Sequence, residues 1–226
     1  MSPILVGSIV LVLIALGIWG IVAAQATRRA EALVLQRLGF RPCPEERDLI
    51  HGAVVALEAT PKATFEIRDP KRLDGRTPVF HYTKARKHGP NDDEPLVEDE
   101  VLFPLQRRSK DGLVLVVKPS AMASGLATRL IRAIAAAPTD RQPADLERID
   151  VALDSPYENL IVALGPSRAR LLDLVDSSTL AVVLGLGDAG ALHVRFRGGW
   201  CSVGSLGRGL PFRVDQLVTR IQPLLR

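Results

Sequence analysis

Three glycines at the end of an apolar run give the clearest hint of chemistry in this chain. The stretch AVVLGLGDAG, residues 181–190, has the G-x-G-x-x-G spacing of turns that cradle a dinucleotide pyrophosphate, through Gly185, Gly187 and Gly190. Such a turn follows a strand, opens a helix and needs an acid about 20 residues further on. Here residues 193–197 alternate apolar and basic side chains as a strand does, and the next acid is Asp215. The sequence therefore predicts a glycine-rich connection between strands, and no bound cofactor.

Residues that act as nucleophiles, bases or metal ligands occur without the companions that such sites need. The chain contains no G-x-S-x-G elbow, no G-x-x-x-x-G-K-[ST] loop and no H-E-x-x-H pattern. The histidines lack acids at ligand spacing, so we expect surface or packing roles for His51, His81, His88 and His193. A carboxylate pair at Asp150 and Asp154 is the weaker alternative for acid–base work. We expect no catalytic residue and no metal site.

An acidic stretch covers residues 89–100, GPNDDEPLVEDE, with six acids and no base. The sequence favours a solvated loop that keeps a sheet edge soluble. Calcium or magnesium binding is an alternative, although the D-x-[DN]-x-[DN]-G spacing is absent and two prolines interrupt the run. A contact with a basic partner also stays open, because the flanking segments are rich in Arg and Lys.

The composition is that of an ordered protein without a nucleic-acid partner. Of 226 residues, 47% are hydrophobic and 24% charged, a balance that excludes wholesale disorder. The net charge of +4 is small for this length, and aromatic residues make up only 4%, too few for base-stacking surfaces. Cys43 and Cys201 are far apart and lack a CxxC partner, which indicates free thiols in a reducing compartment.

The first 27 residues decide where the chain is expected to reside. Residues 1–27 carry no charged side chain, and about 20 apolar residues in a helix cross a bilayer, so we predict a transmembrane anchor. A cleaved signal peptide, suggested by Ala24-Gln25-Ala26, is disfavoured because no basic residue precedes a short apolar core. Trp19 is expected at the interface. Close helix packing is expected at Gly7, Gly17, Gly20, Ala23 and Ala24.

Basic residues after this segment predict its direction. The four arginines that follow it are Arg28, Arg29, Arg37 and Arg41. Basic flanks stay in the cytoplasm, so the amino terminus is expected outside and the body inside a bacterial-type inner membrane, with the arginines among anionic lipid headgroups. Residues 28–43 are predicted to form a juxtamembrane helix and linker, with Gly39 ending the helix.

Periodicity in residues 44–226 predicts a soluble α+β domain. Helical spacing favours helices over 44–58, 123–137, 167–177 and 212–225. Alternating or apolar runs favour strands at 63–69, 77–84, 101–107, 112–119, 148–153, 160–165, 179–186 and 191–203. Turn signals pair the first two strands around Asp74-Gly75 and the next two around Asp111-Gly112. We expect a mainly antiparallel sheet with covering helices on one face, built as one domain or as two halves, 44–137 and 145–226.

These features favour a non-enzymatic, single-pass accessory or scaffold subunit of a larger membrane complex, for example a respiratory or photosynthetic one. Its expected partners are other integral membrane proteins. The alternative is a membrane-tethered module that binds a ligand or signal, with the turn at 185–190 and the basic strand HVRFR framing an anion site. An enzyme with an unfamiliar site ranks last.

Overall fold

A computed structural model describes the chain in two compact units, Met1–Gly39 and Phe40–Arg226. The described residues are 26, 29–58, 64–86, 96–105, 112–117, 146–149, 160–165, 177–190, 193–205 and 213–225. The predicted helix over 123–137 lies outside them, as do residues 167–176 of the helix predicted over 167–177 and residues 150–153 of the strand predicted over 148–153.

The described part of the first unit is a short helix over 29–37. Gly39 follows it with φ 89°, a left-handed conformation that favours glycine, and its N–H donates to the Gln36 carbonyl at 3.0 Å. The predicted helix stop at Gly39 is therefore confirmed. No helix within the described residues has the length and apolar character to cross a membrane. The predicted anchor over 1–27 lies, except for Ala26, outside the described residues.

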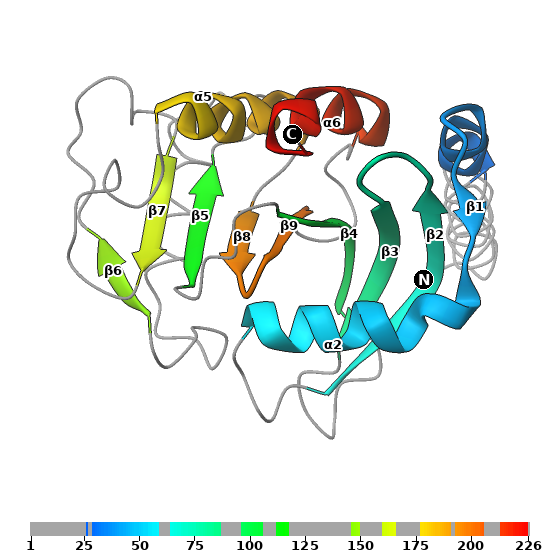
Figure 1. Cartoon of the computed structure of the whole chain (residues 1–226), viewed down its shortest axis with the longest axis horizontal. Coiled ribbons are helices and arrows are strands. Elements are labelled where there is room, and N and C mark those ends of the chain that lie inside the picture. Colours follow the sequence, from blue (N-terminus) through cyan, green and yellow to red (C-terminus); the bar gives the residue numbers. More distant parts are fainter. Residues whose placement is uncertain are drawn as a thin grey trace, which may run out of the picture. The chain divides into compact units, whose positions relative to one another are not determined.

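The second unit contains one antiparallel sheet of nine strands within the described residues (Figure 1). The spatial order is β1-β2-β3-β4-β9-β8-β5-β7-β6. The strands are β1 (Arg41–Pro42), β2 (Phe65–Leu73), β3 (Val79–Arg86), β4 (Leu96–Pro104), β5 (Leu113–Val117), β6 (Glu147–Ile149), β7 (Leu160–Gly165), β8 (His193–Arg197) and β9 (Trp200–Gly204). This sheet with its helices confirms the α+β class.

Strand pairing was predicted correctly for one of the two hairpins. β2 and β3 pair across the loop that contains Asp74-Gly75. The predicted pair around Asp111-Gly112 is wrong: β4 lies between β3 and β9, whereas β5 lies between β8 and β7. The hairpin of β8 and β9 lies between β4 and β5. One sheet therefore contains strands from both of the predicted halves, 44–137 and 145–226.

Within the described residues, three helical segments accompany the sheet. They are η1 (Pro44–Glu46) with α2 (Arg47–Glu58), α5 (Ser177–Gly185) with η3 (Leu186–Ala189), and α6 (Val214–Ile221) with η4 (Gln222–Leu225). The first and last confirm the predicted helices at 44–58 and 212–225. The middle one corrects a prediction, because the run before the three glycines is a helix and not a strand.

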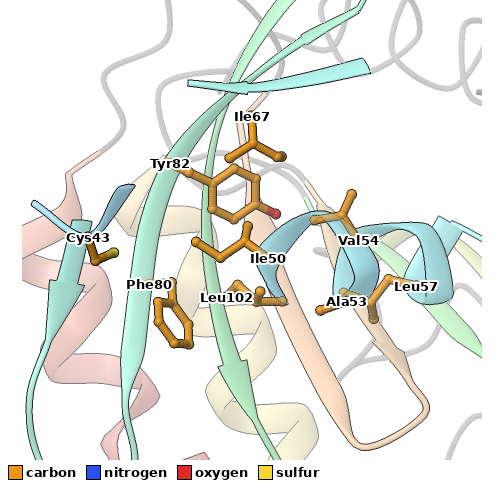
Figure 2. Packing of buried hydrophobic residues seen from close by; sticks show 9 residues of the cluster. All are labelled: Cys43, Ile50, Ala53, Val54, Leu57, Ile67, Phe80, Tyr82 and Leu102. Carbon is orange, nitrogen blue, oxygen red and sulfur yellow. The ribbon is translucent and has the colours of Figure 1, made fainter. Parts of the chain in front are cut away.

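Helices cover both faces of the sheet, whereas cover on one face was predicted. Ile50, Val54 and Leu57 of α2 pack against Ile67, Phe80, Tyr82 and Leu102 on one face (Figure 2). The intervening strand residues point to the other face and are also buried, among them Val101, Phe103 and Val203. The strands lie between α2 and the pair α5 and α6 in both views (Figures 1 and 2).

Candidate functional site

The face of the sheet below α2 changes from apolar to charged along the strands. Residues directly opposite in an antiparallel sheet point to the same face. Leu102 lies opposite Phe80 and belongs to the apolar core, while Glu100 lies opposite Tyr82 and Glu98 opposite Lys84. The register therefore places two acids and a lysine beside the end of the apolar core.

Lys84 is the centre of a buried ionic cluster. Its side chain has no solvent exposure. The ammonium nitrogen lies 2.8 Å from Glu58 Oε1 on α2 and 2.6 Å from Glu98 Oε2, and it also donates to Glu100. One lysine thus joins carboxylates from the helix and from the neighbouring strand.

Two arginines complete the cluster around Glu58, the last residue of α2. Arg86 donates to Glu58 Oε2. Arg195 Nη1 donates to Glu100 Oε1 at 3.1 Å and lies 3.7 Å from Glu58 Oε1. The cluster contains three acids and three bases: Glu58, Glu98, Glu100, Lys84, Arg86 and Arg195.

Two further polar side chains contact Glu100. The Tyr82 hydroxyl donates to Glu100 Oε2 at 2.7 Å. His193 Nε2 lies 3.6 Å from Glu100 Oε1, which is slightly beyond hydrogen-bond distance. The His193 ring lies over Gly204, its partner on β9, where an added Cβ would meet Nε2 at 2.5 Å. Gly204 thus provides the space that the imidazole occupies.

The charges of the cluster reinforce one another. Burial alone would raise the pKa of Glu58, Glu98 and Glu100, but Lys84 and Arg195 outweigh it and lower all three. Burial alone would lower the pKa of Lys84, but the three carboxylates outweigh it and raise that pKa. Burial and then Glu100 raise the pKa of Tyr82. At neutral pH these acids stay ionised and the bases stay charged.

This arrangement suits a structural role better than proton transfer. A general acid or base works best with a pKa near the operating pH, and the cluster moves its carboxylates and its lysine away from neutrality. Within the described ranges, no group of three or more His, Cys, Asp or Glu side chains is arranged to hold a metal ion. The cluster therefore fixes the carboxyl end of α2 on the sheet.

The acidic stretch at 89–100 was predicted as a solvated loop, and for residues 96–100 this is wrong. These residues begin β4, and Glu98 and Glu100 are buried against Lys84. Three consecutive acids, Glu98 to Glu100, interrupt the apolar/polar alternation here, so the sequence carries little signal of a strand. The buried cation that pairs with these acids, Lys84 on the neighbouring strand β3, could not be predicted from the sequence. Residues 89–95 lie outside the described residues.

The three glycines do not form a dinucleotide turn. They follow helix α5 and lead to strand β8, the reverse of the order that pyrophosphate binding needs. Gly190 adopts φ 82° and ends η3 in a left-handed conformation. The Gly185 carbonyl accepts from Arg220 Nη1 at 2.7 Å, and Arg220 also pairs with Asp188. Gly190 thus ends the helical segment, and Gly185 leaves space for the guanidinium of Arg220.

Two residues of the anion site predicted between residues 185–190 and the strand HVRFR already have ionic partners. Arg195 of that strand donates to Glu100, and Asp188 of the turn pairs with Arg220. His193 and Arg195 lie on the face of the sheet that α2 covers, since they are opposite Gly204 and Ser202. Both strand residues are therefore committed to the cluster.

The predicted membrane-interface and helix-packing residues fall largely outside the described part of the chain. Those outside are Gly7, Gly17, Trp19, Gly20, Ala23, Ala24 and Arg28. Arg29 and Arg37 are exposed on the helix of the first unit. Arg41 is exposed on β1 of the second unit. Their predicted contact with lipid headgroups stays a prediction.

The remaining candidates have packing roles or lie on the surface. Cys43 and Cys201 are free, as predicted, and both are buried, which raises the pKa of both thiols, to about 11 for Cys43. His51 is exposed and stacks on Phe65 with ring centroids 4.7 Å apart. His81 is buried beside Phe40. His88, Asp150 and Asp154 lie outside the described residues.

Comparison with known proteins gives a likeness of fold. No protein-family model matches the chain, and no curated protein matches it in sequence. Its structure is similar to the crystal structure of the mycobacterial trehalose monomycolate transport factor A, TtfA, with a TM-score of 0.50 and 11% sequence identity. The match covers 84% of this chain and 89% of that one. At this identity, the likeness shows that the two chains share a fold.

Proposed function

We propose that this chain is a non-enzymatic accessory subunit of a membrane-bound assembly, anchored by residues 1–27, with residues 44–226 as its cytoplasmic body. The observation that carries the proposal is the fold shared, over most of both chains, with a protein named as a transport factor. This favours a transport assembly over a respiratory or photosynthetic one.

Two further observations support the proposal. The first 27 residues carry no charge, and four arginines follow them before residue 42. The most conspicuous polar group within the described residues is a charge-balanced cluster that holds a helix on the sheet. A rigid body on an anchor suits a subunit that acts by contact with other proteins.

The first test is extraction of the full chain from native membranes in mild detergent, followed by size separation and identification of what travels with it. We expect stoichiometric integral membrane proteins. A matched variant replaces residues 1–27 by an unrelated apolar span of equal length. If partners remain bound to that variant, the body makes the contact, and if they are lost, the span does. A monodisperse chain without partners would contradict the proposal.

The same preparation tests the alternative of a ligand- or signal-binding module. A ligand that binds only the folded protein raises its unfolding temperature. Stabilisation by a nucleotide or by a soluble phospholipid headgroup, in a preparation free of partner proteins, would favour that alternative over the accessory subunit.

The direction of insertion gives a separate prediction. Replacing Arg28 and Arg29 by Glu removes the positive flank, so we expect part of the population to expose residues 44–226 on the opposite side of the membrane. Protease accessibility in sealed vesicles measures this. The control reverses Arg47 and Arg76, exposed arginines of the second unit, and changes the net charge by the same amount. Equal accessibility in both variants would remove the support for the predicted topology.

A further inference from the structure

His193 occupies a place where a change of charge is hard to accommodate. It lies on β8 and is buried on the face of the sheet that α2 covers. Its direct neighbours across the sheet are Gly204 on β9 and Val116 on β5, neither of which is charged. Its Nε2 lies 3.6 Å from Glu100. The ring is therefore buried and faces the ionic cluster.

The charged groups around His193 are balanced without it. Within the described residues, β4 contributes Glu98 and Glu100, α2 contributes Glu58, β3 contributes Lys84 and Arg86, and β8 contributes Arg195. Three negative charges meet three positive ones, and Tyr82 is neutral. Protonation of His193 adds a fourth positive charge to this buried group, which costs free energy unless a cation leaves.

The three cations of the cluster differ in how readily their side chains can turn from the carboxylates into water. Lys84 has no exposure and touches all three carboxylates. The side chains of Arg86 and Arg195 are 14% and 18% exposed, so either can turn its guanidinium into water at lower cost. Both arginines lie against Glu58, the last residue of α2. Excess positive charge is therefore relieved most easily at the point where α2 is held.

We propose that His193 is a proton-responsive switch: while neutral it leaves the carboxyl end of α2 fixed on the sheet, and when protonated it releases that end. Histidine is suited to this role, because its ordinary pKa lies near the physiological range. Burial and then Arg195 lower the pKa of His193, so release belongs to acidic conditions. The inference rests on the cluster alone and is independent of the proposed membrane partners.

Amide hydrogen exchange on the full chain in detergent tests the switch. Exchange is measured at about pH 7.5 and about pH 5.5 and corrected for the intrinsic rate at each pH. We expect residues 54–58 of α2 to exchange severalfold faster at the lower pH, while β3 and β4 change less. In His193→Gln this acceleration should disappear, because glutamine cannot take up the proton.

Two further variants keep the outcome decisive. His81→Gln removes another buried histidine, on the opposite face of the sheet, and should retain the local acceleration in α2. Glu58→Gln weakens the contact itself and should give fast exchange of residues 54–58 at both pH values. Slow exchange in this variant would show that Glu58 does not hold the end of α2, and would overturn the proposal even if His193→Gln folds poorly. Acceleration that survives in His193→Gln, or that is spread evenly over the sheet, would overturn the proposal.

Discussion

Gly204 shows how one missing side chain makes room for the cluster. A Cβ at this position would lie 2.5 Å from His193 Nε2 and 3.0 Å from Glu100 Cγ, both buried groups with little freedom to move. We expect Gly204→Ala to destabilise the protein by about 1–3 kcal/mol through overpacking. Gly52→Ala is the matched control, because Gly52 lies in α2 with nothing within 4 Å of an added Cβ.

Gly52→Ala is expected to stabilise the protein by about 0.5–1 kcal/mol, since alanine favours a helix interior over glycine. Denaturant unfolding of the full chain in mild detergent measures both changes. Equal effects of the two substitutions would mean that the imidazole moves away from Gly204 without difficulty.

Burial decides the strength of ion pairs in this molecule. Lys84→Met leaves three buried carboxylates without their shared cation, so we expect a loss of about 3–5 kcal/mol in unfolding free energy. The comparison is Arg68→Met, which breaks an exposed pair with Glu66 on the same sheet and should leave stability almost unchanged. If both variants unfold at the same denaturant concentration, the cluster contributes no more than a surface pair.

At the scale of elements, Arg220 joins α6 to the end of α5. Its Nη1 donates to the carbonyl of Gly185, the last residue of α5, and pairs with Asp188 at 3.0 Å. We expect Arg220→Ala to lower the unfolding free energy by about 0.5–1.5 kcal/mol. Arg213→Ala, which removes an exposed pair with Asp215 and a contact with the Gln216 side chain but no contact with a helix-end carbonyl, should have a much smaller effect. An equal loss in both would show that the carbonyl contact contributes nothing.

The elements that the sequence predicted well are those whose pattern is local. The helix at 44–58 has its apolar residues at helical spacing, and the hairpin of β2 and β3 carries its own turn signal. The partners of β4 and β5 were missed, because the strands that separate them come about 90 residues later in the chain. The helix at 177–185 was missed because its apolar residues, 180–184, form one continuous run, a pattern that buried strands share.

The candidate site was missed for a related reason. The sequence predicts that Glu98 and Glu100 are solvated, because their neighbours in sequence are acidic. Their neighbour in space, Lys84, lies on the adjacent strand. No acid lies near His193 in the sequence, whereas in the structure Glu100 approaches it from a strand almost 100 residues earlier. Local spacing reveals sites built on one element, and this one is assembled from four.

On the scale of the whole molecule, buried histidines set how stability responds to acid. Burial, followed by the charge of Lys71 on the neighbouring strand β2, lowers the pKa of His81 to about 3. Its other described neighbours, Phe40 and Val101, carry no charge. The unfolded chain therefore takes up a proton on His81 below about pH 6.5, while the folded chain does not. Stability falls with pH from there down to about pH 3.

This proton uptake should remove about 2 kcal/mol of unfolding free energy between about pH 7 and about pH 5, since each pH unit below the unfolded pKa contributes about 1.4 kcal/mol. The carboxylates of the cluster act in a lower range, because their pKa values are lowered from 4.5 and their stabilising effect is lost only in stronger acid. Denaturant unfolding across this range should therefore give a shallower slope for His81→Gln than for the natural chain. His193→Gln should also reduce the slope, since its pKa is lowered too, and the double variant should be nearly flat. An unchanged slope in His81→Gln would mean that this imidazole reaches water in the folded protein.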